Sequence, residues 1–308
     1  MKNFFINIVL FFLFTLLVYP VFIILSGYLP ILKNIKRPNL NYRLGSYGHM
    51  YSRINELKKL DNNVDILFLG SSHAYRGFDP RNFKEYKVFN LGSSAQTPIQ
   101  TKVLLNRYLH KINPKTVVFE VNPGILERDG VESSLDIIAN DKNDFLSIKM
   151  AFELNDIKTY NTLIYALFQD VLHPDKDFFE PIKKDDDTYI PGGFVEREIN
   201  YYKFIDYNKS EWKFNKNQLK SFNECIYLLK SKNIRIILVF APITSRLYSS
   251  YVNNYYVDSF IMSYNLEYYN FNKLIKLNDS LHFYDSHHLN QYGVDIFNRK
   301  LIDIINFN

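Results

Sequence analysis

Short apolar runs that end in small or amide-bearing residues constrain the fold of this chain most strongly. Four clear runs and a weaker fifth lie at Val64–Leu69, Lys87–Leu91, Thr116–Val121, Ile234–Phe240 and Leu266–Phe271. Runs that are apolar at nearly every position indicate strands buried on both faces. Helical spacing separates or follows them near Ile99–Lys111, Asn215–Lys232, Ser245–Tyr264 and Leu289–Ile305. This alternation predicts an α/β fold, a flavodoxin-like parallel sheet of about five strands flanked by helices.

The N-terminal segment has a different character. Residues 4–25 are almost wholly apolar, interrupted by Asn7, Thr15 and Pro20. At 1.5 Å per residue, that stretch is long enough to cross a hydrocarbon core of about 30 Å. A secretory signal peptide has an apolar stretch of about 7–15 residues and a small-residue cleavage site, which Leu25–Tyr28 does not resemble. We predict an uncleaved transmembrane helix within residues 1–28 and a connector over residues 29–61, partly helical at Met50–Leu60.

The remaining residues, 62–308, form one predicted domain with an irregular middle. Residues 127–212 fit the strand–helix alternation poorly, contain the charged run Lys183–Asp187, and show no clear strand. Two interpretations stay open. The segment is either a solvated, partly helical insertion or a lid over a functional site, since long irregular segments in compact domains often serve binding.

Composition excludes several classes of function. The formal charge of +5 is spread among mixed acidic and basic residues, so we expect no nucleic-acid partner. The single Cys225 excludes an intrachain disulfide and a cysteine-based zinc cluster. The sequence has no dinucleotide, Walker or His-Glu-x-x-His motif, and we expect neither a cofactor nor a metal.

The first three predicted strands end in Gly70-Ser71-Ser72, in Gly92-Ser93-Ser94 and in Glu120-Val121-Asn122. The carboxyl ends of parallel strands meet at one edge of a sheet, where ligands bind. Far downstream, Asp285 and His288 stand three residues apart. Ser72 as nucleophile, His288 as base and Asp285 as its orienting carboxylate would make a catalytic triad.

Donors for a developing oxyanion are predicted at the same edge. The backbone N–H groups of Ser72 and Gly92 and the side-chain amide of Asn122 would make a three-donor oxyanion hole. His73, Arg76 and Gln96 are candidates for lining the pocket.

Each of these positions also has a simpler interpretation. Asp285 could cap the final helix, and Arg76 could form a salt bridge on a helix surface. His282 and His287, beside His288 and Asp285, suggest a metal cluster, but adjacent histidines usually point apart.

Gly70-Ser71-Ser72, Gly92, Asn122 and Asp285-x-x-His288 resemble, in order and spacing, the four blocks of the SGNH (GDSL-type) hydrolases. The resemblance covers about Val64 to Asn308 without the irregular middle. It implies the triad and oxyanion roles given above. The sequence departs from the family in two places: Ser71 stands where the family has Asp before the nucleophile, and Pro123 stands where it has Asp after Asn122.

The N-terminal span and the sequence from Asp285 to Gly293 look more like a membrane-anchored branch of this superfamily. That branch includes the D-alanine-transfer protein of teichoic acids and the alginate O-acetylation proteins. The resemblance implies work outside the membrane, beside a membrane-bound O-acyltransferase, on a cell-surface polysaccharide or glycopolymer. The predicted function is therefore O-acyl transfer to such a polymer, or its deacylation. The alternative is a non-catalytic scaffold or glycan-binding partner of the acyltransferase.

The charges that flank the span conflict with that placement. Lys2 precedes the span, whereas Lys33, Lys36, Arg37 and Arg43 follow it. The positive-inside rule favours a cytoplasmic domain. We predict an extracytoplasmic domain nevertheless, because the proteins that the chain resembles act on exported polymers.

Overall fold

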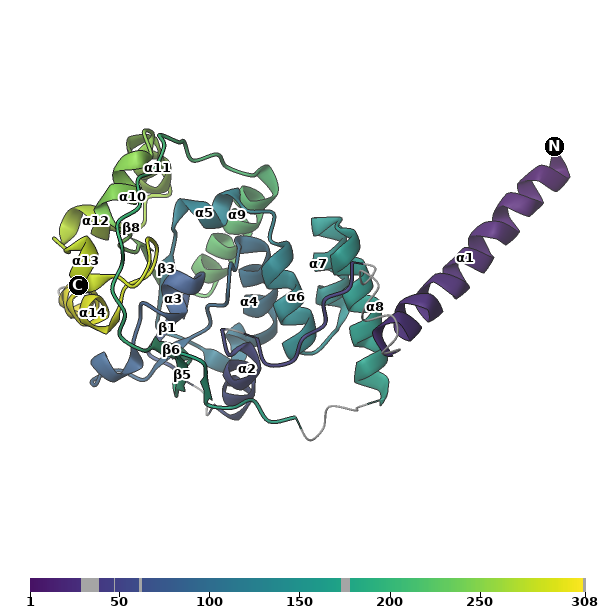
Figure 1. Ribbon diagram of the computed structural model, residues 1–308, viewed down its shortest axis with the longest axis horizontal. Coiled ribbons are helices and arrows are strands. Elements are labelled where there is room, and N and C mark those ends of the chain that lie inside the picture. Colours follow the sequence, from purple (N-terminus) through teal and green to yellow (C-terminus); the bar gives the residue numbers. More distant parts are fainter. Residues whose placement is uncertain (29–38, 47, 61–62, 173–177, 307–308) are drawn as a thin grey trace.

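The computed structural model describes residues 1–28, 39–46, 48–60, 63–172 and 178–306. Figure 1 shows an α/β domain from which one long helix, α1 (Lys2–Tyr28), extends into solvent. The predicted connector lies partly outside the described residues, including Lys33, Lys36 and Arg37. Its helical part is confirmed as α2 (Met50–Lys59).

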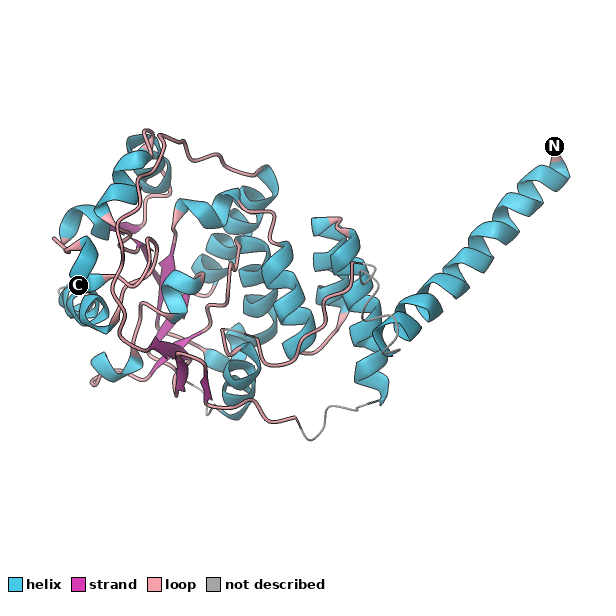
Figure 2. Cartoon of the chain, in the orientation of Figure 1, coloured by secondary structure: helices cyan, strands magenta, loops and turns pink. Residues whose placement is uncertain are grey.

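A parallel sheet forms the centre of the domain (Figure 2). Within the described residues its strand order is β2-β1-β3-β7-β8, and each neighbouring pair is parallel. The strands are β1 (Ile66–Leu69), β2 (Val88–Asn90), β3 (Thr116–Glu120), β7 (Arg235–Phe240) and β8 (Glu267–Asn270). This order is flavodoxin-like and places the reversal of strand order between β1 and β3. The predicted fold class is confirmed, and all five predicted strands are present.

Continuous apolar runs form these strands because both faces of the sheet are covered. In β3, Val117 and Phe119 belong to one hydrophobic core, whereas Val118 between them belongs to the other. In β1, Leu67 and Phe68 divide in the same way. Alternate side chains of each strand therefore point to opposite faces, and burial of both faces favours apolar residues throughout.

Helices cover the two faces unequally. The larger core packs beneath helices that include α4 (Pro98–Ile112) and α9 (Lys216–Ser231), and the smaller core beneath α14 (Gln291–Asn306). The domain also contains shorter helices and a 3₁₀ turn. They are α3 (Ser72–Tyr75), α5 (Pro123–Glu127), α10 (Ser245–Ser250), α11 (Asn254–Met262), α12 (Phe271–Leu274) and α13 (Asp279–His282), with the 3₁₀ turn at Pro80–Asn82. The single helix predicted over Ser245–Tyr264 is two helices, α10 and α11.

The irregular middle of the chain is structured. It contains α6 (Val131–Asn140), α7 (Phe145–Leu154) and α8 (Ile157–Leu172). It also contains an antiparallel sheet of β4 (Lys183–Lys184), β5 (Asp187–Ile190) and β6 (Phe194–Arg197), which the sequence did not reveal. Side chains of α6, α7 and α8 belong to the larger core, among them Ile137, Met150 and Leu163. The segment is partly helical, as predicted, and its helices pack into the domain rather than being solvated. A role as a lid stays a prediction.

The β5–β6 hairpin docks on the edge of the main sheet. Gly192 and Gly193 form its turn with positive φ angles of 93° and 84°. The Gly192 carbonyl accepts from the Asn90 N–H at 2.8 Å. A Cβ atom at Gly193 would lie 2.2 Å from the Asn90 carbonyl oxygen, so the close approach requires glycine.

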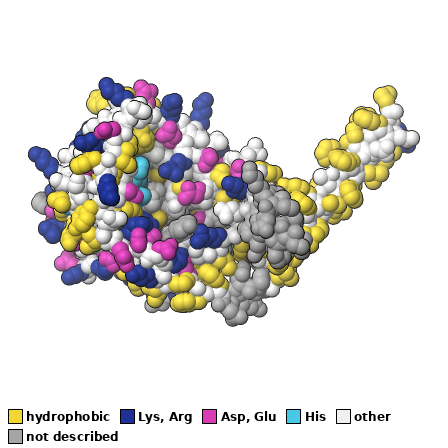
Figure 3. Space-filling model, in the orientation of Figure 1, with side chains coloured by type: hydrophobic (Ala, Val, Ile, Leu, Met, Phe, Trp, Pro, Cys, Tyr) yellow, Lys and Arg dark blue, Asp and Glu magenta, His cyan; other side chains and the backbone are white. Residues whose placement is uncertain are grey.

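α1 is long and apolar enough to cross a membrane, with a mean hydropathy of 2.9 over its best window. Hydrophobic side chains cover its exposed length (Figure 3). Its C-terminal part packs on α8, where the Tyr19 hydroxyl donates to Asn161 at 2.6 Å and Tyr28 bonds Gln169. The helix is compatible with a single-pass anchor. Its orientation stays a prediction.

Candidate active site

Ser72 lies directly beyond the carboxyl end of β1, at the first position of α3. The turn between strand and helix needs Gly70, whose φ of 139° suits glycine. A Cβ atom there would also lie 2.6 Å from the Cβ atom of Glu120. Ser71 caps the helix by accepting from the His73 N–H. The sequence therefore holds the Ser72 side chain at the sheet edge where the strand order reverses.

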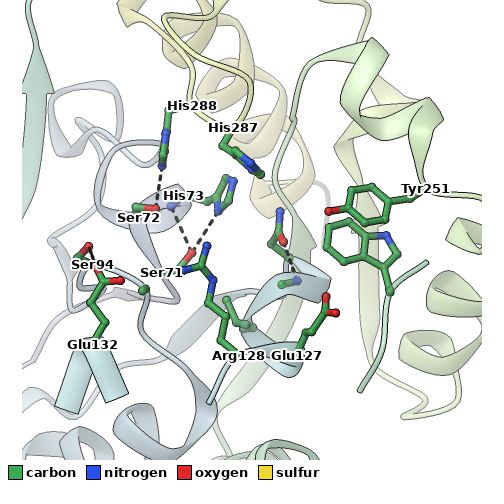
Figure 4. Close-up of a pocket in the computed structure, with 15 residues that line it drawn as sticks. Ser71, Ser72, His73, Ser94, Glu127, Arg128, Glu132, Tyr251, His287 and His288 are labelled. Atoms are coloured by element: carbon green, nitrogen blue, oxygen red, sulfur yellow. Dashed lines mark hydrogen bonds between the residues drawn. The ribbon is translucent and has the colours of Figure 1, made fainter. Parts of the chain in front are cut away.

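The structure brings the three predicted triad residues together, although Ser72 and His288 lie 216 positions apart in the sequence. The Nε2 atom of His288 is 2.8 Å from Ser72 Oγ, as Figure 4 shows. Its Nδ1 atom is 2.9 Å and 3.0 Å from the two carboxylate oxygens of Asp285. A hydrogen-bonded line therefore runs from carboxylate to imidazole to hydroxyl.

The environment of Asp285 keeps its carboxyl group ionised. Burial alone would raise its pKa. The hydrogen bond and the charge of His288, with the backbone N–H groups of His287 and His288, outweigh burial and hold the pKa well below its usual range. An ionised Asp285 favours a proton on Nδ1 of His288, which leaves Nε2 free to accept the Ser72 proton.

Asp285 therefore does not cap the final helix. α14 begins at Gln291, and the Asn290 side chain accepts from the Gly293 N–H at 3.2 Å.

Two rings fix the imidazole plane of His288: Tyr284 stacks at 5.5 Å between ring centroids and His73 at 5.2 Å.

Asn122 follows β3 and has the geometry of an oxyanion donor. Its Oδ1 atom accepts from the Gly124 N–H at 2.9 Å, which fixes the amide orientation. Its Nδ2 atom is buried and has no hydrogen-bond partner among the described residues. A buried amide donor without a partner is costly unless a ligand satisfies it. Asn122 and Ser72 line the same cavity.

The backbone N–H of Gly92 has a partner in the structure, because it donates to the Asn90 side chain at 3.1 Å. Its role in an oxyanion hole stays a prediction. A Cβ atom at Gly92 would lie 2.9 Å from the Ser71 carbonyl oxygen and 3.0 Å from that of Gly70. Glycine is therefore also needed here for the close approach of two backbone segments. The other two candidate donors are Asn122 Nδ2 and the Ser72 N–H, which lies in the first turn of a helix.

The three candidate pocket residues have different surroundings. His73 lines the cavity, and burial, followed by the charges of His288 and His287, lowers its pKa well below the ordinary value. Arg76 forms a buried bidentate ion pair with Asp187 at 2.8 Å and 2.7 Å rather than a surface salt bridge, and it lines a second cavity that also contains Ser72 and His288. Gln96 is buried in its loop and donates to Thr101.

The cavity beside Ser72 has a volume of about 440 Å³. In Figure 3 histidine side chains lie in a hollow flanked by acidic and basic groups. The sequence did not single out several of its walls. Trp212 and Tyr251 stack with ring centroids 3.5 Å apart on one side, and Glu127, Arg128 and Glu132 lie on others (Figure 4).

Glu120 is another residue of the candidate site. Its position at the end of a predicted strand was visible in the sequence, but its role was not recognised. Its fully buried carboxylate accepts from the Asn122 N–H at 2.7 Å and from the Ser71 hydroxyl at 3.1 Å. It therefore ties the loop that carries the nucleophile to the loop that carries the oxyanion donor. The Ser71 hydroxyl also lies 3.1 Å from His73 Nδ1. Burial raises the pKa of Glu120 to about 7.

The described residues contain no group of three or more histidine, cysteine or acidic side chains able to hold a metal ion. The Nδ1 atom of His282 accepts from the Asn278 N–H at 2.9 Å, and His282 lines neither of the cavities that contain Ser72.

No protein-family model and no curated protein sequence matches the chain. Solved structures that are similar to it include the following two. One, described as a "putative acylhydrolase" from Bacteroides fragilis, has 12% sequence identity and a TM-score of 0.41 over 86% of this chain and 98% of that chain. The other, a GDSL-like lipase from Bacteroides thetaiotaomicron, has 11% identity and a TM-score of 0.40 over 85% and 98%.

The second description names the GDSL class that the sequence resembles. Matches at these TM-scores carry no weight for function, so the assignment below rests on the geometry of the site. The membrane-anchored branch stays a prediction.

Proposed function

We propose that this protein carries out acyl-ester chemistry through an acyl-enzyme on Ser72. The observation that carries the proposal is the continuous line of hydrogen bonds from Asp285 through His288 to Ser72 Oγ. The unpartnered Nδ2 atom of Asn122 in the same cavity supports it. A surface serine with a chance histidine neighbour would need neither feature.

The reaction has two stages. In the first, His288 Nε2 takes the Ser72 proton while Oγ attacks the ester carbonyl carbon. Asn122 Nδ2–H and the Ser72 N–H stabilise the tetrahedral oxyanion. The C–O bond to the alcohol then breaks, and His288 gives its proton to the departing oxygen.

In the second stage, an acceptor hydroxyl gives a proton to His288 and attacks the acyl carbon. Collapse of this intermediate releases the new ester, or the free acid if water is the acceptor, and returns the proton to Ser72 Oγ. Both outcomes use the same groups. The protein is therefore an esterase in water and an O-acyltransferase when another hydroxyl reaches the acyl-enzyme first.

The finer part of the proposal concerns the setting. The SGNH-like motifs and the apolar α1 support a membrane-anchored protein whose domain lies outside the cytoplasmic membrane. Its substrate would be a cell-surface polysaccharide or glycopolymer, and its partner a membrane-bound O-acyltransferase. The basic residues after α1 oppose this orientation, so it needs a direct test.

A serine-reactive fluorophosphonate probe tests the nucleophile. We expect it to label the full-length protein in detergent and to fail with Ser72→Ala. Ser94→Ala is a matched control, because Ser94 lines the same cavity but bonds Glu132 at 2.9 Å. Equal labelling of wild type and Ser72→Ala would refute the assignment and favour the alternative, a non-catalytic glycan-binding partner.

A further inference from the structure

A second cavity meets the first at the catalytic pair. It also has a volume of about 440 Å³ and shares Ser72, Ser94 and His288 with the first. Every side chain that lines it carries a polar group. Beyond the shared residues and Asp285, these are Tyr75, Arg76, Asp187, Arg197, Asn200 and Tyr284.

The proposed chemistry at Ser72 determines which half of the ester, acyl or alcohol, would lie in each cavity. The carbonyl oxygen must point at Asn122, which lines the first cavity. The oxygen of the alcohol must lie near His288 Nε2, because that atom protonates it on departure. Asp285 and Tyr284, which flank His288, line the second cavity. The alcohol half of the ester therefore extends into the second cavity.

The lining of this cavity selects a class of alcohol. The lining contains two guanidinium groups, Arg76 and Arg197, and two carboxylates, Asp187 and Asp285, so its formal charges balance. With no aliphatic side chain in its lining, the cavity offers little to a lipid alcohol. Hydrogen-bonding groups beside an aromatic ring suit a compact molecule with many hydroxyl groups.

Arg197 is the more accessible of the two charged residues that the hairpin contributes to this cavity, the other being Asp187. It contacts Asp186 at 3.0 Å and Asp187 at 3.5 Å and lies 5.1 Å from the Tyr284 ring centroid. A guanidinium carries five N–H donors, more than these two contacts require. Its side chain is about one-third exposed, at 33%.

The inserted hairpin supplies this wall. Asp187 and Arg197 are directly paired across β5 and β6. Arg76, the residue that follows α3, donates two hydrogen bonds to Asp187 and so fixes the hairpin relative to Ser72. The exposed Asn200 follows β6. The irregular middle of the chain thus contributes one wall of the site.

We propose that the second cavity binds a neutral sugar unit as the alcohol half of the ester, with Arg197 and Asn200 as specificity-determining residues. This inference rests on the proposed function, because it takes Ser72 and His288 as the reacting groups. It adds to it the class of alcohol and the residues that recognise it.

A binding experiment tests the inference directly. Full-length protein in detergent is applied to a panel of immobilised neutral and uronic-acid oligosaccharides. We expect retention on neutral members. Arg197→Ala should weaken it by about ten-fold or more, as loss of hydrogen bonds from a charged donor does. Asn200→Ala should also weaken it, and it changes an exposed side chain that does not endanger folding.

Arg246→Ala is the matched control. Arg246 also pairs with an aspartate, Asp206 at 2.8 Å, and lies 4.5 Å from the ring centroid of Phe204, but it lines neither cavity. It should bind as the wild type does. Preference for uronic-acid members, no retention on neutral members, or equal retention of Arg197→Ala and Arg246→Ala would overturn the inference.

The two proposals fail separately. Ser72→Ala should lose fluorophosphonate labelling and keep sugar binding. A protein that binds neutral sugars through Arg197 but is labelled equally with and without Ser72 retains the sugar site and loses the nucleophile. A protein labelled at Ser72 that binds no neutral sugar retains the nucleophile and loses the sugar site.

A kinetic measurement adds a readout that a purely structural role would not move. Acetate release is compared for p-nitrophenyl acetate and for an acetylated form of the best-bound neutral oligosaccharide. For Arg197→Ala we expect kcat/KM to fall about ten-fold further with the acetylated sugar, mainly through KM. Equal falls with both substrates would contradict a role in recognising the alcohol.

Discussion

Replacing Glu120 by glutamine is expected to change how the stability of the protein depends on pH. Glu120 ends β3 beneath the nucleophile, and its carboxyl group is fully buried. Burial raises its pKa from the ordinary 4.5 to about 7, and the hydrogen bonds from Asn122 and Ser71 lower it only in part.

The sign follows from proton binding. Between pH 4.5 and pH 7 the folded protein keeps a proton on Glu120 that the unfolded chain has lost. Unfolding releases that proton, so the free energy of unfolding falls as the pH rises through this window and levels off above it. A difference of about 2.5 pKa units at ~1.4 kcal/mol each gives about 3.5 kcal/mol over the whole window, and somewhat less from pH 5 upward. Glutamine has no such proton, so Glu120→Gln should lack the fall.

The assay compares melting temperatures from pH 5 to pH 8 in detergent, using the fluorescence of Trp212, the only tryptophan in the sequence. For a domain of this size, about 3 kcal/mol corresponds to roughly 6–12 °C. The melting temperature of Glu120→Gln should therefore rise relative to wild type by up to that amount between the two pH values. Glu85→Gln, at an exposed position, is the control. A constant difference between Glu120→Gln and wild type across this range would refute the reasoning.

Three further predictions concern the site and its placement. Asp285→Asn should leave the fold intact and slow turnover by up to about 10⁴, because His288 loses the carboxylate that fixes its tautomer. His287→Ala should slow turnover far less than His288→Ala, and equal losses of activity would point to a different base. Asn122→Ala should lower kcat by about 10²–10³ through loss of an oxyanion donor, measured on an ester that the wild type turns over. Alkaline phosphatase fused behind Asn308 should be active, and a matched cytoplasmic reporter silent; the reverse pattern would exclude cell-surface acylation.

The central sheet could be predicted from sequence because its signal is local. Strands buried on both faces need apolar residues at successive positions, and β1, β3 and β7 show them. The hairpin strands β5 and β6 lack that signal. They are four residues each and contain half-buried polar positions. Their pairing depends on the turn at Gly192 and Gly193 and on docking against Asn90.

Contacts between distant segments account for what the sequence could not show at the site. Arg76 pairs with Asp187, 111 positions away. The break between α10 and α11 has a similar origin. Tyr251 leaves the helical path, forms a bridge with Ser210 and stacks on Trp212. Helical spacing over Ser245–Tyr264 could not show that a tertiary contact would interrupt the helix.

The hydrogen-bonded arrangement of Ser72, His288 and Asp285 could be predicted from residue type and order. The state of the candidate oxyanion donors could be predicted only in part. A glycine after a strand offers a backbone N–H, but the sequence does not show whether that N–H is already used. The backbone N–H of Gly92 donates to the Asn90 side chain. The side-chain oxygen of Asn122 accepts from the Gly124 N–H, whereas its side-chain nitrogen has no partner among the described residues and could donate to a ligand.

Glu120 also changes the meaning of the departure at Ser71. Serine in place of the family's aspartate gives some support to the alternative of a non-catalytic protein. In the structure a carboxyl oxygen still lies 3.1 Å from the Ser71 side chain, supplied by the neighbouring strand β3. The same carboxyl group holds the Asn122 N–H. The nucleophile loop and the oxyanion loop are therefore fixed to one buried group, so the substitution at Ser71 is compatible with a working Ser72.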